Sequence, residues 1–178
     1  MEQSPPSPES SRLLFRPLAP IDAVMFYLEI TDDLTKHWIG LERADCFEKC
    51  EEDFQTSLAN IRNGLSVEFI PITKDRGESV GYAGIVPTFE HGDLEFEVVF
   101  WVKQKLRGKG YGKEIFATLF EWAKENFTNA PHLIYSVTEG NTESEAIIKR
   151  LGLRVVRTWQ APKRGVVRNV TDYELPLR

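Results

Sequence analysis

The sequence predicts a single α+β domain built on a mixed, mostly antiparallel sheet of seven strands that is flanked by about four helices. Strand and helix patterns follow one another in the order β-α-α-β-β-β-α-β-α-β-β, and the run of three strands is typical of hairpin connections. The 178 residues, of which 42% are hydrophobic, suffice for the core of one domain.

The first residues are the only segment that looks separate from this domain. Residues 1–11 are rich in proline and serine and lack an apolar core, so we predict a disordered tail, followed by one domain over 12–178. The tail does not resemble a signal peptide, and no apolar run approaches the ~20 residues of a membrane span. We therefore expect a cytoplasmic protein without membrane attachment.

The N-terminal third is predicted to hold one strand and two helices. A short strand over 13–16 ends at Pro17, and a helix over 20–28 follows. A longer helix over 43–61 ends before Gly64, and its apolar residues recur at helical spacing: Phe47, Cys50, Phe54, Leu58 and Ile61.

The middle of the chain is predicted to be a run of strands. The segments 65–72, 79–86 and 94–102 carry strand patterns, and a turn at 74–77 separates the first two.

The C-terminal half alternates helices and strands. A helix over 110–127 has an apolar face of period 3.6, a strand over 133–137 follows it, and strands over 153–159 and 166–175 form a closing hairpin around 162–165.

A short helix is predicted over 142–151, between the strand that ends at 137 and the closing hairpin. Thr142 and Glu145 have the spacing of a capping box, and Gly152 suits the C-terminal end of the helix.

Composition narrows the function classes. The formal net charge of −5 argues against a general nucleic-acid binder and is compatible with a cationic or amine-bearing substrate. Cys46 and Cys50 lie four residues apart on one predicted helix face, and no histidine stands near them at a zinc-ligand spacing. We expect two free thiols and no metal.

The segment KLRGKGYGKE, residues 105–114, reverses the acidic character of the chain. Glycines alternate in it, and no acid interrupts the five cations Lys103, Lys105, Arg107, Lys109 and Lys113. Glycines let the backbone approach an anion closely, and a helix N-terminus offers free N–H groups. The pattern predicts a phosphate cradle, with a solvated basic turn or a nucleic-acid contact as the alternatives.

Spacing excludes two familiar phosphate loops. A P-loop requires serine or threonine after Gly112-Lys113, where this chain has Glu114. A dinucleotide fingerprint requires glycine at the position of Lys113.

Two further matches identify a family that this chain resembles. The segment EVVFWVKQKLRGKGYG, residues 97–112, is similar to the acetyl-CoA signature of GNAT N-acetyltransferases, whose core is Q/R-x-x-G-x-G/A. NTESEAIIKRLGL, residues 141–153, resembles the second family segment, N-x-x-S/A followed by LGF. The opening SRLLFRPLAPIDA and the ending TDYELPL resemble the RimJ/RimL-type branch, which acetylates N-terminal amines of ribosomal proteins and includes members with other amine substrates.

The resemblance implies where coenzyme A binds. The pantetheine arm would lie between the strands 94–102 and 133–137, and the pyrophosphate would lie on the amides of 107–112. The expected CoA-binding residues are Trp101, Val102, Arg107, Gly108, Lys109, Gly110, Tyr111, Gly112, Asn141 and Ser144. A backbone N–H at a bulge within 99–101 would hold the thioester carbonyl oxygen.

Amide formation requires a neutral amine, so an acceptor that loses its proton easily is favoured, and a base is needed to remove that proton. At pH 7, deprotonation costs about 1 kcal/mol for an α-amine and about 4.6 kcal/mol for a lysine. By its place in the strand, Glu97 is the expected base, directly or through a water, and Glu95 shares its strand face. Without a nucleophile nearby, we expect direct transfer from acetyl-CoA to the amine.

The group that assists the leaving thiolate is less clear from the sequence. Many GNAT enzymes have a tyrosine seven residues after the motif asparagine, and this chain has Ile148 there. Ser144 is the remaining hydroxyl, with Tyr173 as a second choice.

The acceptor site is predicted only in outline. Tyr27, His37, Trp38 and Glu95 are its candidates, together with the hairpin residues 160–168. The acceptor is expected to be a peptide N-terminus or a small amine, and the protein a monomer or homodimer. The alternative is a CoA-binding sensor or interaction module with the same fold and no catalysis.

Overall fold

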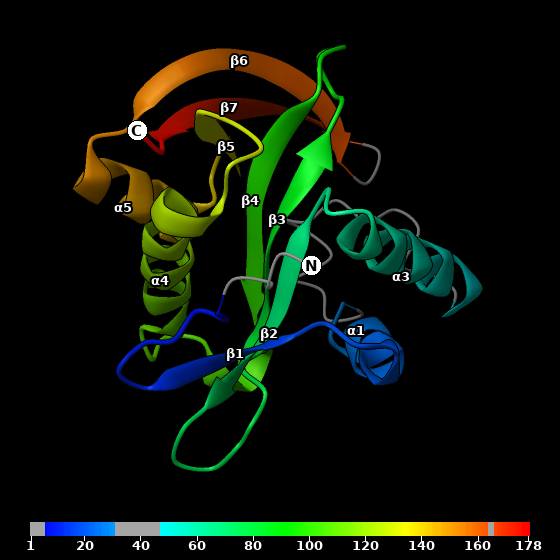
Figure 1. Ribbon diagram of the computed structural model, residues 1–178. Coiled ribbons are helices and arrows are strands. Elements are labelled where there is room, and N and C mark those ends of the chain that lie inside the picture. Colours follow the sequence, from blue (N-terminus) through cyan, green and yellow to red (C-terminus); the bar gives the residue numbers. More distant parts are fainter. Residues whose placement is uncertain (1–5, 31–46, 164–165) are drawn as a thin grey trace.

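The computed structural model describes residues 6–30, 47–163 and 166–178, and in them one seven-stranded sheet carries the fold, as predicted. The strand order is β1-β2-β3-β4-β5-β7-β6 (Figure 1). The strands are β1 (Leu13–Pro17), β2 (Val67–Thr73), β3 (Gly81–Thr88), β4 (Glu95–Val102), β5 (His132–Thr138), β6 (Arg154–Lys163) and β7 (Val166–Pro176).

The sheet is antiparallel except between β4 and β5. β3 and β4 pair along their whole length, from Gly81 opposite Val102 to Thr88 opposite Glu95. β4 and β5 run parallel and pair only where Glu97 lies opposite Ile134. The two central strands therefore separate beyond Glu97, which opens the gap that the family resemblance predicts.

Helices cover both faces of the sheet. The 3₁₀ turns are η1 (Pro20–Asp22) and η2 (Gln104–Leu106), and the α-helices are α1 (Ala23–Ile30), α3 (Phe47–Arg62), α4 (Tyr111–Asn126) and α5 (Thr142–Leu151). α4 and α5 lie on one side of the sheet, and α1 and α3 lie on the other (Figure 1). None of the helices in the described ranges is long and apolar enough to cross a membrane.

The alternation of β4 divides its side chains between two cores. Phe96 and Val98 join the large core under α4, whose apolar stripe of Ile115 and Leu119 is fully buried. Trp101 joins the smaller core under α1 and α3, which also contains the buried, free Cys50 predicted from the sequence. Glu95 and Glu97 share the strand face of Trp101, so they face the α3 side.

α5 spans the residues predicted for it, but its capping residue differs from the prediction. Asn141, not Thr142, is the N-cap, and its Oδ1 accepts a hydrogen bond from the Ser144 N–H at 3.2 Å. Glu145 Oε1 accepts from the Gly140 N–H at 2.9 Å. In a capping box this acidic side chain would instead accept from the N–H of the N-cap residue itself. The asparagine offers a side-chain acceptor at the right distance, and the threonine becomes the first helical residue.

Part of the predicted disordered tail makes defined contacts. Trp122 Nε1 on α4 donates to the Pro6 carbonyl at 2.6 Å, and the Phe15 N–H donates to the Pro8 carbonyl at 3.1 Å. Glu9 forms a β-bridge with Leu14. Three backbone groups of 6–11 are therefore paired, namely the carbonyls of Pro6 and Pro8 and the Ser10 N–H, which donates to the Leu13 carbonyl at 2.9 Å.

Candidate active site

The glycine loop has the backbone that an anion cradle requires. Gly108 and Gly110 have φ angles of 74° and 81°, in the left-handed region that favours glycine. Gly110 is the N-cap of α4, and no side chain caps this end. The first N–H groups of α4 and the positive end of its dipole can therefore serve a bound anion.

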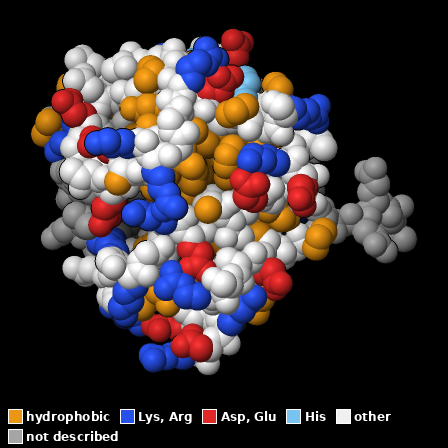
Figure 2. All heavy atoms as spheres, turned by 90° about the vertical axis from the view of Figure 1, so that its left-hand side faces the viewer, with side chains coloured by type: hydrophobic (Ala, Val, Ile, Leu, Met, Phe, Trp, Pro, Cys, Tyr) orange, Lys and Arg blue, Asp and Glu red, His pale blue; other side chains and the backbone are white. Residues whose placement is uncertain are grey.

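A cleft of about 440 Å³ opens beside this loop. The end of β4, the loop with the start of α4, and the start of α5 form its walls. Its lining includes Phe100, Trp101, Val102, Arg107, Gly108, Gly110, Tyr111, Gly112, Asn141 and Ser144. On the face formed by α4 and α5, hydrophobic side chains gather in a central patch with charged side chains around it (Figure 2). An apolar groove with a polar, glycine-lined end fits a pantetheine arm joined to a pyrophosphate.

The five cations of the loop do not all point into this cleft. Only Arg107 and Lys113 line it, so the expectation that Lys109 binds CoA finds no support in the geometry. Lys105 pairs with Glu78 at 2.6 Å, and Lys103 is buried. Arg107 Nε donates to the Val102 carbonyl at 3.0 Å, which ties the loop to the end of β4. The charge run that the sequence shows as continuous is therefore divided between different sides of the loop.

A strap from the N-terminal segment holds the loop from outside, which sequence reasoning missed. Glu114 accepts from Ser10 Oγ at 2.6 Å, from the Arg12 N–H at 3.1 Å and from Arg12 Nε at 2.6 Å. Arg12 also donates to the Lys109 carbonyl at 3.2 Å and lies over the Tyr111 ring at 4.4 Å. Burial raises the pKa of Glu114, but the bonds from Ser10 and Arg12 outweigh it and leave that pKa lowered.

A second cleft, of about 720 Å³, lies on the α3 side of the sheet. It takes its lining from α3, from strands β2 to β7 and from the β3–β4 turn. The lining includes the carboxylates Asp53, Glu68, Glu90, Glu95, Glu97 and Asp172 and one arginine, Arg157. The two clefts share Phe100, Trp101, Asn141 and Ser144, so they meet where β4 and β5 separate.

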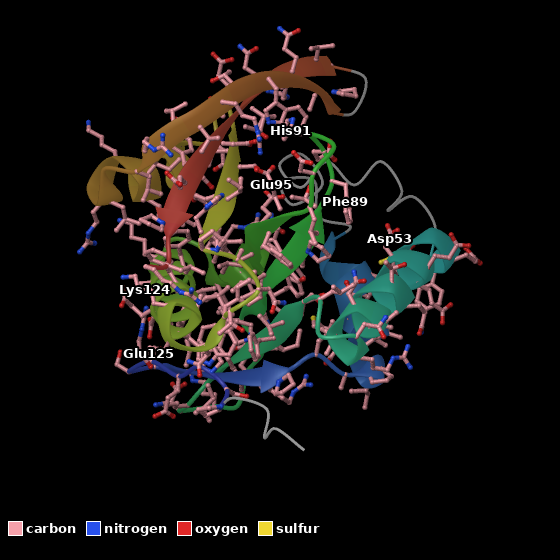
Figure 3. The ribbon with its side chains drawn as sticks, turned by 45° about the horizontal axis from the view of Figure 1, so that its top comes forward. Asp53, Phe89, His91, Glu95, Lys124 and Glu125 are labelled. Atoms are coloured by element: carbon pink, nitrogen blue, oxygen red, sulfur yellow. The ribbon has the colours of Figure 1, made fainter. Side chains whose placement is uncertain are left out.

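The two predicted acids have different surroundings in this second cleft. Arg157 bridges Glu95 and Asp172, with 2.7 Å between its Nε and Asp172 Oδ2. Figure 3 shows Glu95 and His91 beneath the β6–β7 hairpin, with Asp53 on α3 across from them. Glu95 is held in this ion pair, and Glu97 lies two residues nearer along β4 to Phe100 and Trp101, where the clefts meet.

A buried carboxylate that no sequence pattern indicates organises the far wall of this cleft. Asp172 in β7 is 1% exposed and lies 3.2 Å from His91 Nε2, while Trp159 Nε1 donates to it at 3.1 Å. Together with Arg157, three donors from the turn and from β6 meet on this one group. From this region the cleft is lined by Arg157, Trp159, Val170 and Asp172, and none of the described residues among the expected 160–168 lines it.

The other expected acceptor residues are placed as follows. Tyr27 in α1 packs edge-on against Phe47, with ring centroids 5.4 Å apart, and does not line the described part of the cleft. His37 and Trp38 lie outside the described residues. Tyr27 was a candidate because it lies in the region of the first two helices, and there its ring packs between α1 and α3.

The hydroxyl groups near the junction come from α5 and β5. Ser144 lines both clefts, and Tyr135 OH donates to its Oγ at 3.0 Å. Ile148 is buried in the large core, and Tyr173 lines neither cleft. Sequence reasoning missed Tyr135, because a tyrosine in a strand most often serves the core.

The backbone of β4 also differs from expectation. Its pairing with β3 runs without a register shift, so the bulge expected within 99–101 is absent from this ladder. The Lys103 N–H bonds to the carbonyl of Val80, the residue before β3, and N–H groups alternate along a strand. The Phe100 N–H therefore points away from β3, toward the gap.

Comparison with known proteins agrees with this arrangement. The family model described as "Acetyltransferase (GNAT) domain" matches residues 12–154. The N-acetyltransferase YdgE of Bacillus subtilis, itself uncharacterized, is 28% identical over 109 residues, which are 61% of this chain and 68% of that protein.

Solved structures share the fold at low sequence identity. RimL, the ribosomal L7/L12 α-N-protein acetyltransferase, in complex with coenzyme A, has a TM-score of 0.75 at 12% identity, over 94% of this chain and 95% of that one. The ribosomal-protein-S5-alanine acetyltransferase of Vibrio fischeri has a TM-score of 0.76 at 13% identity, over 96% of each chain. These likenesses show that the chain shares their fold. With a family match over most of its length, the chain belongs to the GNAT acetyltransferases and is an acetyl-CoA-dependent N-acetyltransferase.

Proposed function

We propose that the protein transfers an acetyl group directly from acetyl-CoA to a primary amine, either a peptide N-terminus or a small amine, while both are bound. The observation that carries this proposal is the meeting of the two clefts at Phe100, Trp101, Asn141 and Ser144. A donor lying along the loop-side cleft and an acceptor entering from the α3 side reach each other only there.

Different residues bind the donor, remove the amine proton and stabilise the charges that develop during the transfer. Arg107 and the backbone of 108–112 hold the pyrophosphate of acetyl-CoA, the co-substrate. Glu97 removes the proton from the amine, directly or through a water. The Phe100 N–H donates to the carbonyl oxygen as it gains charge, and Ser144 donates to the sulfur as the C–S bond breaks.

The charge of the acceptor cleft favours an amine. Six carboxylates and one arginine line its described part, so the potential there attracts a cation. A peptide N-terminus or a small amine arrives positively charged and loses its proton to Glu97 at the junction. The lower cost of deprotonating an α-amine makes it the easier acceptor.

A route through an acetylated cysteine is disfavoured. Cys50 lines the acceptor cleft, but burial, with a smaller contribution from the charge of Asp53, raises the pKa of its thiol. A raised pKa leaves little thiolate at neutral pH, and the thiolate is the nucleophile.

The test is thiol release from acetyl-CoA with a panel of peptides and small amines. We expect turnover with at least one α-amine or small amine, and a loss of about 10²-fold in kcat for Glu97→Gln. The matched control is Glu90→Gln, which makes the same change of charge at an exposed position of the same cleft and should keep kcat within about threefold. Acetyl-CoA binding without turnover on any acceptor would instead indicate a binding module.

A further inference from the structure

Tyr135 occupies a position that the proposed mechanism does not yet use. It lies in β5 beside the gap, is 5% exposed and lines the acceptor cleft. Its ring stacks on Phe100 at 6.0 Å and packs against Phe116 at 5.0 Å. The ring is therefore held from two sides, and the hydroxyl is directed to Ser144 at the start of α5.

The direction of this hydrogen bond matters for chemistry. Tyr135 OH donates to Ser144 Oγ at 3.0 Å, and a phenol is a stronger acid and so a better donor than an aliphatic alcohol. A serine hydroxyl has one proton and two lone pairs. Since Ser144 Oγ accepts from Tyr135, its own proton remains available to another acceptor in the region where the two clefts meet.

The backbone around Ser144 is fixed as well. The Ser144 N–H donates to Asn141 Oδ1 at 3.2 Å, and α5 packs its buried Ile147 and Ile148 into the large core. The serine therefore has little freedom apart from rotation about χ1, and the contact with Tyr135 restricts that rotation.

We propose that Tyr135 is a positioning residue, which holds the Ser144 hydroxyl as a hydrogen-bond donor to the sulfur of coenzyme A. This inference rests on the proposed transfer reaction. In the chemical step the amine nitrogen bonds to the thioester carbon, the amine proton passes to Glu97, and the C–S electron pair goes to sulfur. Ser144 stabilises that thiolate by a hydrogen bond, and coenzyme A leaves as the thiolate and takes its proton from solvent.

Tyr135 does not itself give up its proton in this scheme. Burial, reinforced by the charge of Glu97 and opposed by the bond to Ser144, raises the pKa of Tyr135 to about 12. A free thiol has a pKa of roughly 8.5, so transfer from the phenol to the thiolate would be strongly unfavourable. The tyrosine orients Ser144 and keeps its own proton throughout the reaction.

Kinetics test the inference in wild type, Tyr135→Phe, Ser144→Ala and the double variant. We expect Tyr135→Phe to lower kcat about tenfold, with unchanged KM for acetyl-CoA, and to have no further effect when Ser144 is already alanine. The phenylalanine keeps the stacked ring, so the melting temperature should stay close to that of wild type. Thr158→Val removes a hydroxyl that bonds to Thr171 and lines neither cleft, so this variant is the matched control and should leave kcat unchanged.

Binding provides a second readout that needs no turnover. The preference of wild type for coenzyme A over desulfo-coenzyme A should grow as the pH rises from 7 to 9 and the thiolate fraction increases, and Tyr135→Phe and Ser144→Ala should each reduce that preference severalfold. Equal kcat and equal preference in wild type and Tyr135→Phe would overturn the role of Tyr135 while leaving the transfer reaction intact. A Tyr135-dependent preference without turnover on any amine would support the hydrogen bond and refute the proposed function.

Discussion

At the scale of single residues, the proposed acetyl-CoA site depends on backbone conformations that few side chains tolerate. Gly110 combines a φ of 81° with a place at the head of α4, where the amides of the loop approach the cleft. A Cβ there would have open space, with its nearest contact, Arg12 Nη2, at 3.7 Å. The requirement for glycine is therefore conformational, joined to the close approach of a ligand.

Gly110→Ala should weaken acetyl-CoA binding about tenfold, because the alanine disfavours the backbone that presents the amides. Gly64→Ala is the matched control, since Gly64 has a φ of 70° and lies far along the chain at the end of α3. Both variants should lose roughly 1 kcal/mol of folding stability, measured by urea unfolding. Calorimetry with equal affinities in the two variants would remove Gly110 from the donor site.

The residues that could be predicted from the sequence are those whose role is set by local spacing. The positions of Arg107, Gly110 and Asn141 follow from motifs a few residues long. Tyr135 and Arg12 could not be found this way, because their partners lie 9 and 102 residues away and only the folded chain brings them together. The position seven residues after Asn141 holds Ile148, which left Ser144 as the expected hydroxyl, and the structure adds Tyr135 from β5 as its partner.

At the scale of elements, the order and type of the helices and strands could be predicted because their hydrophobic periods are strong. Some boundaries differ from those expected. The first strand of the closing hairpin was expected over 153–159, with the turn around 162–165, whereas β6 continues to Lys163. β6 is an edge strand, where a proline can remain in the sheet because its missing N–H is not needed by a neighbour.

At this scale, the contacts of Ser10 and Arg12 with Glu114 on α4 should make the stability of the protein depend on pH. Because the pKa of Glu114 is lowered in the folded protein, its stabilising effect is complete above its usual pKa of roughly 4.3 and is lost as the pH falls through the lowered value. Glu114→Gln should therefore cost about 1–2 kcal/mol of unfolding free energy at pH 7. The difference from wild type should shrink below about pH 4.

Urea unfolding at pH 7 and at pH 3.5 measures this difference. Glu121→Gln is the control on the same helix, since Glu121 pairs only with the exposed Lys124 at 2.7 Å and should contribute a few tenths of a kcal/mol. An equal loss at both pH values for Glu114→Gln would contradict a charged anchor.

At the scale of the whole molecule, the single register pair between β4 and β5 divides the protein into a donor side and an acceptor side. α4 and α5 cover the first, and α3 and the β6–β7 hairpin border the second (Figure 1). Short motifs carry the donor side, so the sequence alone suggests where coenzyme A would bind. The acceptor side draws on α3, six strands and a turn, so no local pattern encodes its shape.

The cleft between the glycine loop and α5 is proposed to bind acetyl-CoA, and the transfer reaction depends on this binding. Isothermal titration calorimetry of acetyl-CoA into the wild-type protein tests it most directly. We predict saturable binding at one site per chain, displaced by coenzyme A and weakened in Gly110→Ala but not in Gly64→Ala. The absence of binding at millimolar acetyl-CoA would contradict the account.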